Sequence, residues 1–193
     1  MTSAPIRVVG LSGSLRQGSY NSAALRAAQA LAPDGMTIDT AAIGDLPLYN
    51  EDLRASGYPP EVARLRAQIA SADAVLFVTP EYNYSISGVL KNAIDWASRP
   101  PDQPFEGKPV AMMGASGGLF GTARAQNHLR QMLVFLNAHP INKPQVMIGQ
   151  AAGKFDEAGN LTDEPTRQHI RSLLESLAAW TQRLRAGAVA KAE

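Results

Sequence analysis

Residues 6–21 of the chain read IRVVGLSGSLRQGSYN and join a short apolar run to a turn of glycine and serine. The apolar residues of 6–11 predict a buried strand, and the alanines and leucine that recur over 23–31 have the spacing of a helix. The turn therefore precedes the N-terminus of a helix, where unpaired backbone N–H groups and the helix dipole both favour an anion. This arrangement indicates a phosphate-binding turn.

The turn departs from two common nucleotide-binding patterns. Gly13 and Gly18 match the glycines of a P-loop, but Ser19 and Tyr20 stand where its lysine and its serine or threonine are needed. The fingerprint of dinucleotide-binding domains fails too, because Gly10 and Gly13 are three residues apart and no third glycine follows at the required step. These departures exclude a P-loop hydrolase and disfavour a dinucleotide turn.

Polar side chains take the place of the missing glycines. Hydroxyl, guanidinium and amide groups in the turn can donate to the oxygens of a terminal phosphate, so a monophosphate ester fits best. The candidate phosphate ligands are Ser14, Arg16, Ser19 and Asn21. A plainer interpretation stays open, in which Ser19 and Asn21 only cap the helix and Ser14 only turns the chain.

The composition favours a single domain whose partners are small molecules. The chain has 193 residues, 45% of them hydrophobic, and contains no linker-like tract, so we expect one domain over residues 1–193. Its 18 Lys and Arg residues and 17 Asp and Glu residues leave a net charge of +1 and form no basic cluster. We therefore expect neither a nucleic-acid partner nor a membrane partner.

Cysteine content and the first residues bear on the compartment. The chain has no cysteine, which excludes disulfides, thiolate metal sites and a cysteine nucleophile and suits a reducing environment. Residues 1–7 lack the pattern of a signal peptide, and no apolar run is long enough to cross a bilayer. We expect a cytoplasmic location.

Apolar runs and helical patterns alternate along the rest of the chain. This alternation predicts a parallel sheet with right-handed crossovers, covered by helices on both faces. In the order 2-1-3-4-5 the first, third and fourth strands are neighbours, and the loops 12–21, 80–88 and 116–121 that follow them would surround one ligand. The expected strands are 6–11, 36–43, 74–78, 108–115 and 141–148. The expected helices are 22–31, 61–71, 89–97 and 122–136, with a last helix after the loop 149–163 that buries Ile170, Leu173, Leu174, Leu177 and Leu184.

A long connection at 44–60 is rich in proline, glycine and aspartate. Loops of this length in compact domains are usually functional or disordered, and we favour a pocket-forming loop. Tyr49 is the candidate substrate-binding residue within it. Alternatively, the ring of Tyr49 only pins the loop to the body of the protein.

Motifs on these loops resemble those of one known family. Together they are similar to the NAD(P)H-dependent FMN reductases, which include bacterial quinone and chromate reductases and azo-dye reductases. The resemblance covers residues 6–148 and implies a flavodoxin-like α/β/α sandwich of three layers, with a five-stranded parallel sheet in the order 2-1-3-4-5. The motifs are GSLR at 13–16 with Ser19 and Asn21, PEYNYS at 80–85 with LKNAIDW at 90–96, and Ser116 followed by Ala123, Arg124 and HLR at 128–130.

The resemblance also implies roles for the loop residues. Residues 80–84 would pass along the isoalloxazine ring of FMN, and Ser116 and Gly117 would face its pyrimidine edge, where backbone N–H groups stabilise the charge of the reduced flavin. Taken alone, residues 80–84 can also be a proline turn with aromatic packing, and 116–118 an ordinary glycine turn. The implied ligands are Ser14, Arg16, Ser19 and Asn21 for the phosphate and Pro80, Glu81, Tyr82, Asn83 and Tyr84 for the ring.

The implied reaction carries a hydride from NADPH or NADH to FMN and then passes reducing equivalents to a small acceptor, such as a quinone, an azo compound, chromate or free flavin, in ping-pong order. Because the cofactor does the chemistry, we expect no catalytic acid or base. His128, His139 and His169 are too far apart in sequence for a recognisable triad or metal motif, so we expect no metal. Arg124 is a candidate for attracting the nicotinamide or an anionic acceptor, or else a solvated or intersubunit charge.

Two other functions stay open on the residues alone. A flavodoxin-type electron carrier would bind FMN without a nicotinamide site, but such carriers commonly present a strongly charged face, and this chain is nearly neutral. A Rossmann domain that binds NAD alone would use Asp39 for the ribose, against the glycine spacing. The resemblance further implies a homodimer or homotetramer, in which Trp96 is either an intersubunit contact or a core residue.

Overall fold

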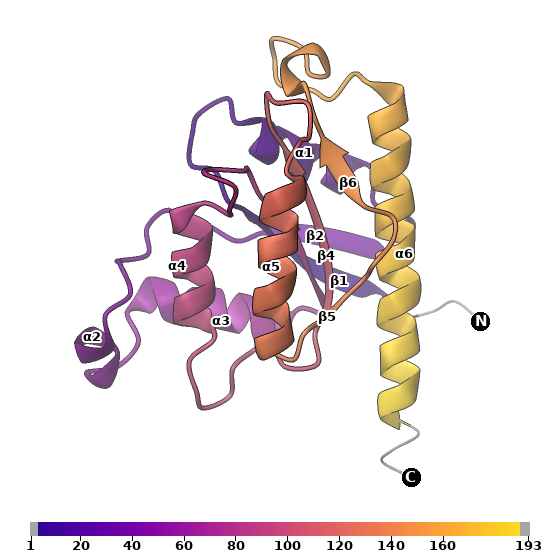
Figure 1. The fold of residues 1–193 in the computed structure, drawn as a ribbon. Coiled ribbons are helices and arrows are strands. Elements are labelled where there is room, and N and C mark those ends of the chain that lie inside the picture. The colour runs from indigo at the N-terminus through magenta and orange to yellow at the C-terminus, as the bar shows by residue number, and fades with distance from the viewer. Residues whose placement is uncertain (1–3, 190–193) are drawn as a thin grey trace.

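The computed structural model describes residues 4–189, in which strands and helices alternate along the chain (Figure 1). The strands are β1 Ile6–Ser12, β2 Met36–Thr40, β3 Ala74–Val78, β4 Pro109–Ala115, β5 His139–Pro140 and β6 Val146–Ile148. The helices are α1 Tyr20–Ala30, α2 Glu51–Ala55, α3 Pro60–Ser71, α4 Gly88–Ala97, α5 Ala123–Phe135 and α6 Glu164–Val189, with a 3-10 turn at Ala151–Gly153.

The strands form one parallel sheet in the order β2-β1-β3-β4-β5, and β6 also pairs with β4. Val9 of β1 is aligned with Asp39 of β2 on one side and with Val75 of β3 on the other. Every residue of β3 and of β4 is buried, as expected for central strands that helices cover on both faces. The predicted strand order is confirmed.

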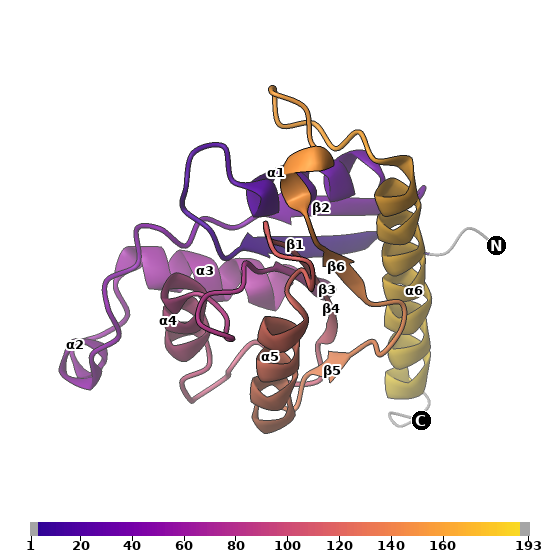
Figure 2. The same cartoon turned by 45° about the horizontal axis from the view of Figure 1, so that its top comes forward.

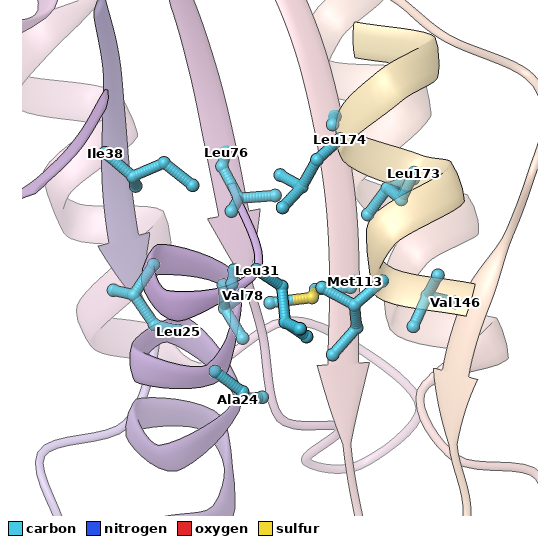
Figure 3. Packing of buried hydrophobic residues seen from close by; sticks show 14 of the residues in the cluster. Ala24, Leu25, Leu31, Ile38, Leu76, Val78, Met113, Val146, Leu173 and Leu174 are labelled. Atoms are coloured by element: carbon cyan, nitrogen blue, oxygen red, sulfur yellow. The ribbon is translucent and has the colours of Figure 1, made fainter. Parts of the chain in front are cut away.

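Alternate side chains of the central strands point into two separate cores. Leu76 and Val78 pack with α1 and α6, whereas Val75 and Phe77 pack with α3, α4 and α5. Figure 2 shows helices on both sides of the sheet, and Figure 3 shows the first core, in which Leu174 of α6 lies beside Leu76 of β3. The predicted α/β/α sandwich is confirmed.

Helix α1 packs on β1 at Gly10. A Cβ atom added to Gly10 would lie 2.6 Å from Cδ1 of Leu25, so a larger residue there would displace the side chain of Leu25. This close packing holds the N-terminus of α1 near the carboxyl end of β1, where the Gly/Ser turn lies.

The predicted fifth strand over 141–148 is wrong in its bounds. Val110 pairs with Pro140, and its carbonyl accepts from the N–H of Ile141 at 2.9 Å, but the next strand begins where Met113 pairs with Val146, so residues 142–145 leave the ladder between two short strands. Pro140 and Pro144 lack the N–H group that a continuous ladder needs. The apolar residues of this stretch therefore mark an interrupted strand at the edge of the sheet.

The second strand and the long connection after it also differ from the prediction. The second strand ends at Thr40 and not at residue 43, although Ala41 and Ile43 are buried against the core of α3, α4 and α5. The long connection at 44–60 contains the short helix α2, which the side chain of Asn50 caps by accepting from the N–H of Asp52 at 2.8 Å.

Two expectations concern the chain as a whole. Within residues 4–189, none of the helices combines the length and the apolarity that crossing a bilayer requires. The single domain over residues 1–193 stays a prediction, because residues 1–3 and 190–193 lie outside the described part.

Candidate functional site

Three connections that follow β1, β3 and β4 meet at the carboxyl ends of these strands. The N–H of Gly13 donates to the carbonyl of Val78 at 2.8 Å, and the hydroxyl of Ser87 donates to the carbonyl of Gly13 at 2.6 Å. The N–H of Thr79 donates to the carbonyl of Met113 at 3.0 Å. The structure therefore brings together the loops that the sequence analysis grouped, at the sheet edge where parallel α/β folds bind ligands.

Glycines lie where these loops touch, and glycine is required at Gly114. A Cβ atom at Gly114 would lie 2.0 Å from the carbonyl oxygen of Thr79 and 2.4 Å from Oγ1 of Thr122. One at Gly13 would lie 3.1 Å from both Cδ of Pro80 and Oγ of Ser87. Two adjacent loops are thus held at backbone contact distance, which leaves little freedom in their relative position.

The Gly/Ser turn that precedes α1 contains unused backbone donors. Within residues 4–189, the N–H groups of residues 14–18 find no protein acceptor. Arg16 adds an exposed guanidinium that, in the same part of the chain, faces no carboxylate and lies over the ring of Tyr20 at 5.4 Å. A run of unpaired donors, a cation and the positive end of a helix dipole together suit a phosphate.

Ser19 caps α1, as the plainer interpretation anticipated. Its buried Oγ accepts from the N–H of Asn21 at 3.2 Å and from that of Ser22 at 3.4 Å. Because a hydroxyl that accepts still has its own proton, Ser19 can donate to an anion while it caps the helix. Ser14 is also buried and lies in the run of unused N–H donors.

Asn21 is tied to the backbone at the end of β4. Its Nδ2 donates to the carbonyl of Ala115 at 2.9 Å, and its Oδ1 accepts from the N–H of Ala115 at 2.8 Å. The side chain is buried, and these bonds leave one N–H of the amide for any ligand. The structure therefore places Asn21 as a brace between α1 and β4 more than as a phosphate ligand.

Glu81 holds the loop after β3 against the N-terminus of α5. Its Oε2 accepts from the backbone N–H of Arg124 at 2.9 Å and of Ala125 at 3.1 Å, and its Oε1 pairs with the guanidinium of Arg124 at 3.2 Å. Thr122 precedes the helix but makes no side-chain cap bond. The carboxylate of Glu81 therefore caps α5 from another loop, and the backbone of Glu81 is what remains to face a ligand.

The tip of this loop is a tight hairpin. Tyr82 and Ser85 exchange two backbone hydrogen bonds of 2.9 Å, and between them Asn83 and Tyr84 have φ values of 51° and 63°, as in a type I′ turn. Tyr82 and Tyr84 are exposed, and Arg124 lies over the ring of Tyr84 at 4.2 Å. The hairpin thus presents two aromatic rings beside the guanidinium of Arg124.

A second polar contact fastens the hairpin to α5. Nδ1 of His128 and the hydroxyl of Ser85 are 3.0 Å apart. With Glu81, this contact fixes residues 81–85 on the first two turns of α5. Pro80 is buried at the base of the loop.

Ser116 shapes the turn after β4. Its hydroxyl donates to the carbonyl of Gly121 at 2.7 Å and accepts from the N–H of Gly118 at 3.3 Å. The same turn packs on the end of β6, where a Cβ atom at Gly149 would lie 2.3 Å from the carbonyl oxygen of Leu119. Gly117 is exposed with open space around its Cα, so a ligand can approach its backbone closely.

The structure does not place Tyr49 with the three loops. Its ring packs edge-on against Trp96 at 4.9 Å, and its N–H donates to Oδ1 of Asn92 at 2.8 Å. Trp96 lies about 12 Å along α4 from the helix end that meets the loops. The substrate-binding role predicted for Tyr49 is therefore unsupported, and the alternative that it pins the long connection to α4 agrees with these contacts.

The hydroxyl of Tyr49 is also committed. It donates to the carboxylate of Glu51, and this bond raises the pKa of Tyr49. Arg54 and then Tyr49 lower the pKa of Glu51 to about 2, so this pair stays a neutral phenol and a carboxylate near neutral pH.

Trp96 is a core residue within one chain. It is fully buried, and its Nε1 donates to the carbonyl of Pro47 at 2.8 Å. The intersubunit contact considered for Trp96 is therefore wrong, because its ring does not reach the surface.

Ser87 holds two of the loops together and was not predicted from the sequence. Ser87 bonds to Gly13 and also accepts from the N–H of Leu90 at 3.3 Å, which makes it the N-cap of α4. A serine directly before a helical pattern is a recognisable N-cap signal and would have identified it. No local pattern marks the pairing of Glu81 with α5.

Comparisons with known proteins show the family of this chain. The family model described as NADPH-dependent FMN reductase matches residues 6–153. An NAD(P)H-dependent FMN reductase of Pseudomonas aeruginosa is 63% identical over 180 residues, which are 93% of this chain and 97% of the relative. An NAD(P)H:quinone oxidoreductase of Solanum tuberosum is 50% identical over an alignment of 186 positions, and the match covers 93% of this chain and 95% of the relative.

A solved structure is also similar along most of its length. The flavoenzyme NAD(P)H:(acceptor) oxidoreductase FerB from Paracoccus denitrificans superposes with a TM-score of 0.84 at 38% identity. The superposition covers 92% of this chain and 98% of that protein.

Proposed function

Because this chain belongs to the NADPH-dependent FMN reductase family, we propose that it is an FMN-dependent oxidoreductase that takes a hydride from NADPH or NADH and reduces a quinone. The observation that carries the proposal is the run of unused N–H donors over residues 14–18 beside Arg16, at the N-terminus of α1. The family membership favours this enzyme over a flavodoxin-type carrier and over a domain that binds NAD alone.

The phosphate of FMN binds over the Gly/Ser turn in this proposal. The backbone N–H groups of 14–18, the hydroxyls of Ser14 and Ser19 and the guanidinium of Arg16 supply donors, and Asn21 keeps α1 and β4 in register around them. Such charge-assisted bonds favour a terminal phosphate, which displays more oxygens than a bridging pyrophosphate.

The flavin ring lies along residues 80–84 in this proposal, with its pyrimidine edge toward Ser116 and Gly117. When bound, FMN supplies the hydride-accepting and hydride-donating chemistry. The chain contributes a rigid wall, because Glu81 and the hairpin are fastened to α5, and it contributes an open backbone at Gly117. No side chain is required to act as an acid or a base.

The donor and the acceptor use the exposed side of the same site. Arg124 is paired with Glu81, yet its side chain stays 42% exposed beside Tyr84, so it can attract a nicotinamide phosphate or an anionic acceptor. A quinone acceptor rests on the name of the Solanum relative. Azo compounds, chromate and free flavin are further acceptors that we propose from the resemblance alone.

Assembly and location complete the proposal. We propose a homodimer or homotetramer, which light scattering on the purified protein would distinguish. The cytoplasmic location and the lack of nucleic-acid and membrane partners stay predictions.

A titration of the purified chain with FMN tests the proposal, together with the absorbance of each nicotinamide at about 340 nm with and without a quinone. We expect a quinone-dependent loss of nicotinamide absorbance. The Arg16→Ala variant should bind FMN about 10- to 100-fold more weakly, because it loses a charge-assisted bond. Arg183→Ala, an arginine on α6 that packs on Trp180, is the control and should bind as the unchanged protein does. Equal FMN affinity in the Arg16→Ala variant would refute the phosphate site.

A further inference from the structure

Arg16 lies on an aromatic pair that the proposed function does not use. The guanidinium carbon of Arg16 is 5.4 Å from the ring centroid of Tyr20, the first residue of α1. The ring of Tyr20 in turn is 5.3 Å from that of Phe155, at an interplanar angle of 30°. A stack of three side chains therefore links the Gly/Ser turn to the segment that follows β6.

The base of this stack is well anchored. Phe155 is buried in the core shared by α1 and α6, and it forms a bridge with the buried Leu161. The carbonyl of Gly159 accepts from the guanidinium of Arg26 on α1 at 3.3 Å. Residues 155–161 are thus fastened to α1 at two places, so Phe155 is a fixed support for Tyr20.

Stacking of Arg16 on Tyr20 leaves the N–H donors of the guanidinium free. An aromatic ring attracts the face of the group, whereas the N–H donors that bind phosphate lie around its edge. An exposed arginine otherwise samples many rotamers, and immobilising it weakens binding. A ring that holds the guanidinium beforehand therefore strengthens its bond to a phosphate without touching the ligand.

We propose that Tyr20, supported by Phe155, is a positioning residue that holds Arg16 for the phosphate and so favours FMN over riboflavin, which lacks that phosphate. This inference rests on the proposed function, because it assumes that the phosphate binds at the turn. It gives residues 155–161 a part in cofactor selection, although they lie outside the three loops.

A double-mutant cycle on FMN binding tests the inference. We expect Tyr20→Leu to weaken FMN binding roughly 2- to 10-fold, the range expected for ordering one flexible side chain. Tyr20→Phe keeps the ring and should bind FMN as the unchanged protein does. In the Arg16→Ala background, Tyr20→Leu should have no further effect, because the group that it positions is absent.

Riboflavin and a matched control separate positioning from general damage. Tyr20→Leu should leave riboflavin affinity unchanged, and Phe155→Leu should weaken FMN binding in the same direction. Tyr58→Leu removes a comparable tyrosine, stacked under Arg66 at 4.5 Å on the segment before α3, and should leave FMN affinity unchanged. Urea unfolding of each variant shows whether the fold is intact before binding is compared.

The outcomes are distinguishable. If Tyr20→Leu and Arg16→Ala weaken FMN binding additively, or if Tyr20→Leu weakens FMN and riboflavin equally, the positioning role is overturned while the phosphate site stands. If Arg16→Ala itself leaves FMN affinity unchanged, the phosphate site of the proposed function is overturned and the inference with it. The inference is supported if Tyr20→Leu weakens FMN binding when Arg16 is present and has no effect when Arg16 is replaced by alanine.

Discussion

Asn21 was predicted as a phosphate ligand, but its side chain mainly joins two elements of the fold. It lies in a turn rich in donors, and its amide is a suitable phosphate ligand. Its two side-chain polar atoms nevertheless bind the backbone of Ala115, 94 residues away in the sequence. Its main contribution is to keep the N-terminus of α1 beside the end of β4.

Replacing the amide of Asn21 by a carboxylate tests this role. In Asn21→Asp one oxygen still accepts from Ala115, but the other faces a carbonyl oxygen and has lost its proton donor. We expect the free energy of unfolding in urea to fall by about 1–3 kcal/mol, the cost of a buried polar group without a partner. Asn127→Asp, at an exposed position on α5, is the control and should change it by less than about 0.5 kcal/mol. A stable Asn21→Asp protein would contradict the brace.

At the scale of the element, α5 depends on another loop for its beginning. Thr122 makes no cap bond with its side chain, and its Oγ1 accepts instead from Nε2 of Gln126 at 3.0 Å. Glu81 caps the helix and at the same time fixes the wall along which the flavin ring is proposed to lie. The stability of the helix and the shape of the site are therefore coupled through one carboxylate.

Removing this cap tests the coupling. We expect Glu81→Ala to lower the free energy of unfolding by about 0.5–2 kcal/mol, the usual cost of a lost N-cap. Glu81→Gln keeps an oxygen that accepts from Arg124 and Ala125 and should lose less. Thermal unfolding followed by circular dichroism measures the stability of both variants. Glu157→Ala, at an exposed position, is the control. The coupling is absent if Glu81→Ala unfolds at the same temperature as the control.

At the scale of the whole molecule, Asp73 joins two layers of the sandwich. It precedes β3, accepts from the N–H of Arg7 in β1 at 2.8 Å, and pairs with Arg185 of α6 at 2.6 Å. Burial works to raise the pKa of Asp73, but the N–H of Arg7 and the guanidinium of Arg185 outweigh it, so the pKa is lowered from 3.8. The folded protein therefore binds the proton of Asp73 less readily than the unfolded chain does.

This lowered pKa predicts the direction of an acid effect. The stabilisation from Asp73 is fully present above the unfolded pKa and is lost as the pH falls through the folded one. We expect the unfolding free energy to decline between about pH 5 and pH 2, and to decline less steeply in Asp73→Asn, which has no proton to take up. Urea unfolding at several pH values measures both slopes. Equal slopes in the unchanged protein and in Asp73→Asn would show that Asp73 does not contribute to the loss of stability in acid.

The order of the sheet, and with it the meeting of the three loops, was expected from the resemblance of the motifs to a known family. The amino-acid sequence by itself determined the alternation of strands and helices and the Gly/Ser turn before the first helix. These features follow from local signals, since an unbroken apolar run such as Ala74–Val78 suits a covered central strand and a Gly/Ser turn before an alanine-rich helix suits an anion. The interruption of the last strand at 142–145 and the helix α2 escaped the same reasoning, because both are short and their signals are mixed with those of loops.

Only the tertiary structure decided which polar groups of the site are free. Asn21 is committed to Ala115, Glu81 to the first turn of α5, and Tyr49 to α4, whereas the N–H groups of 14–18 and the guanidinium of Arg16 stay available within the described residues. The physical reason is that each committed group found a partner more than 40 residues away, as with the 43 residues between Glu81 and Arg124. A buried donor or acceptor must be paired, and folding chooses its partner by position in space, which no local sequence pattern records.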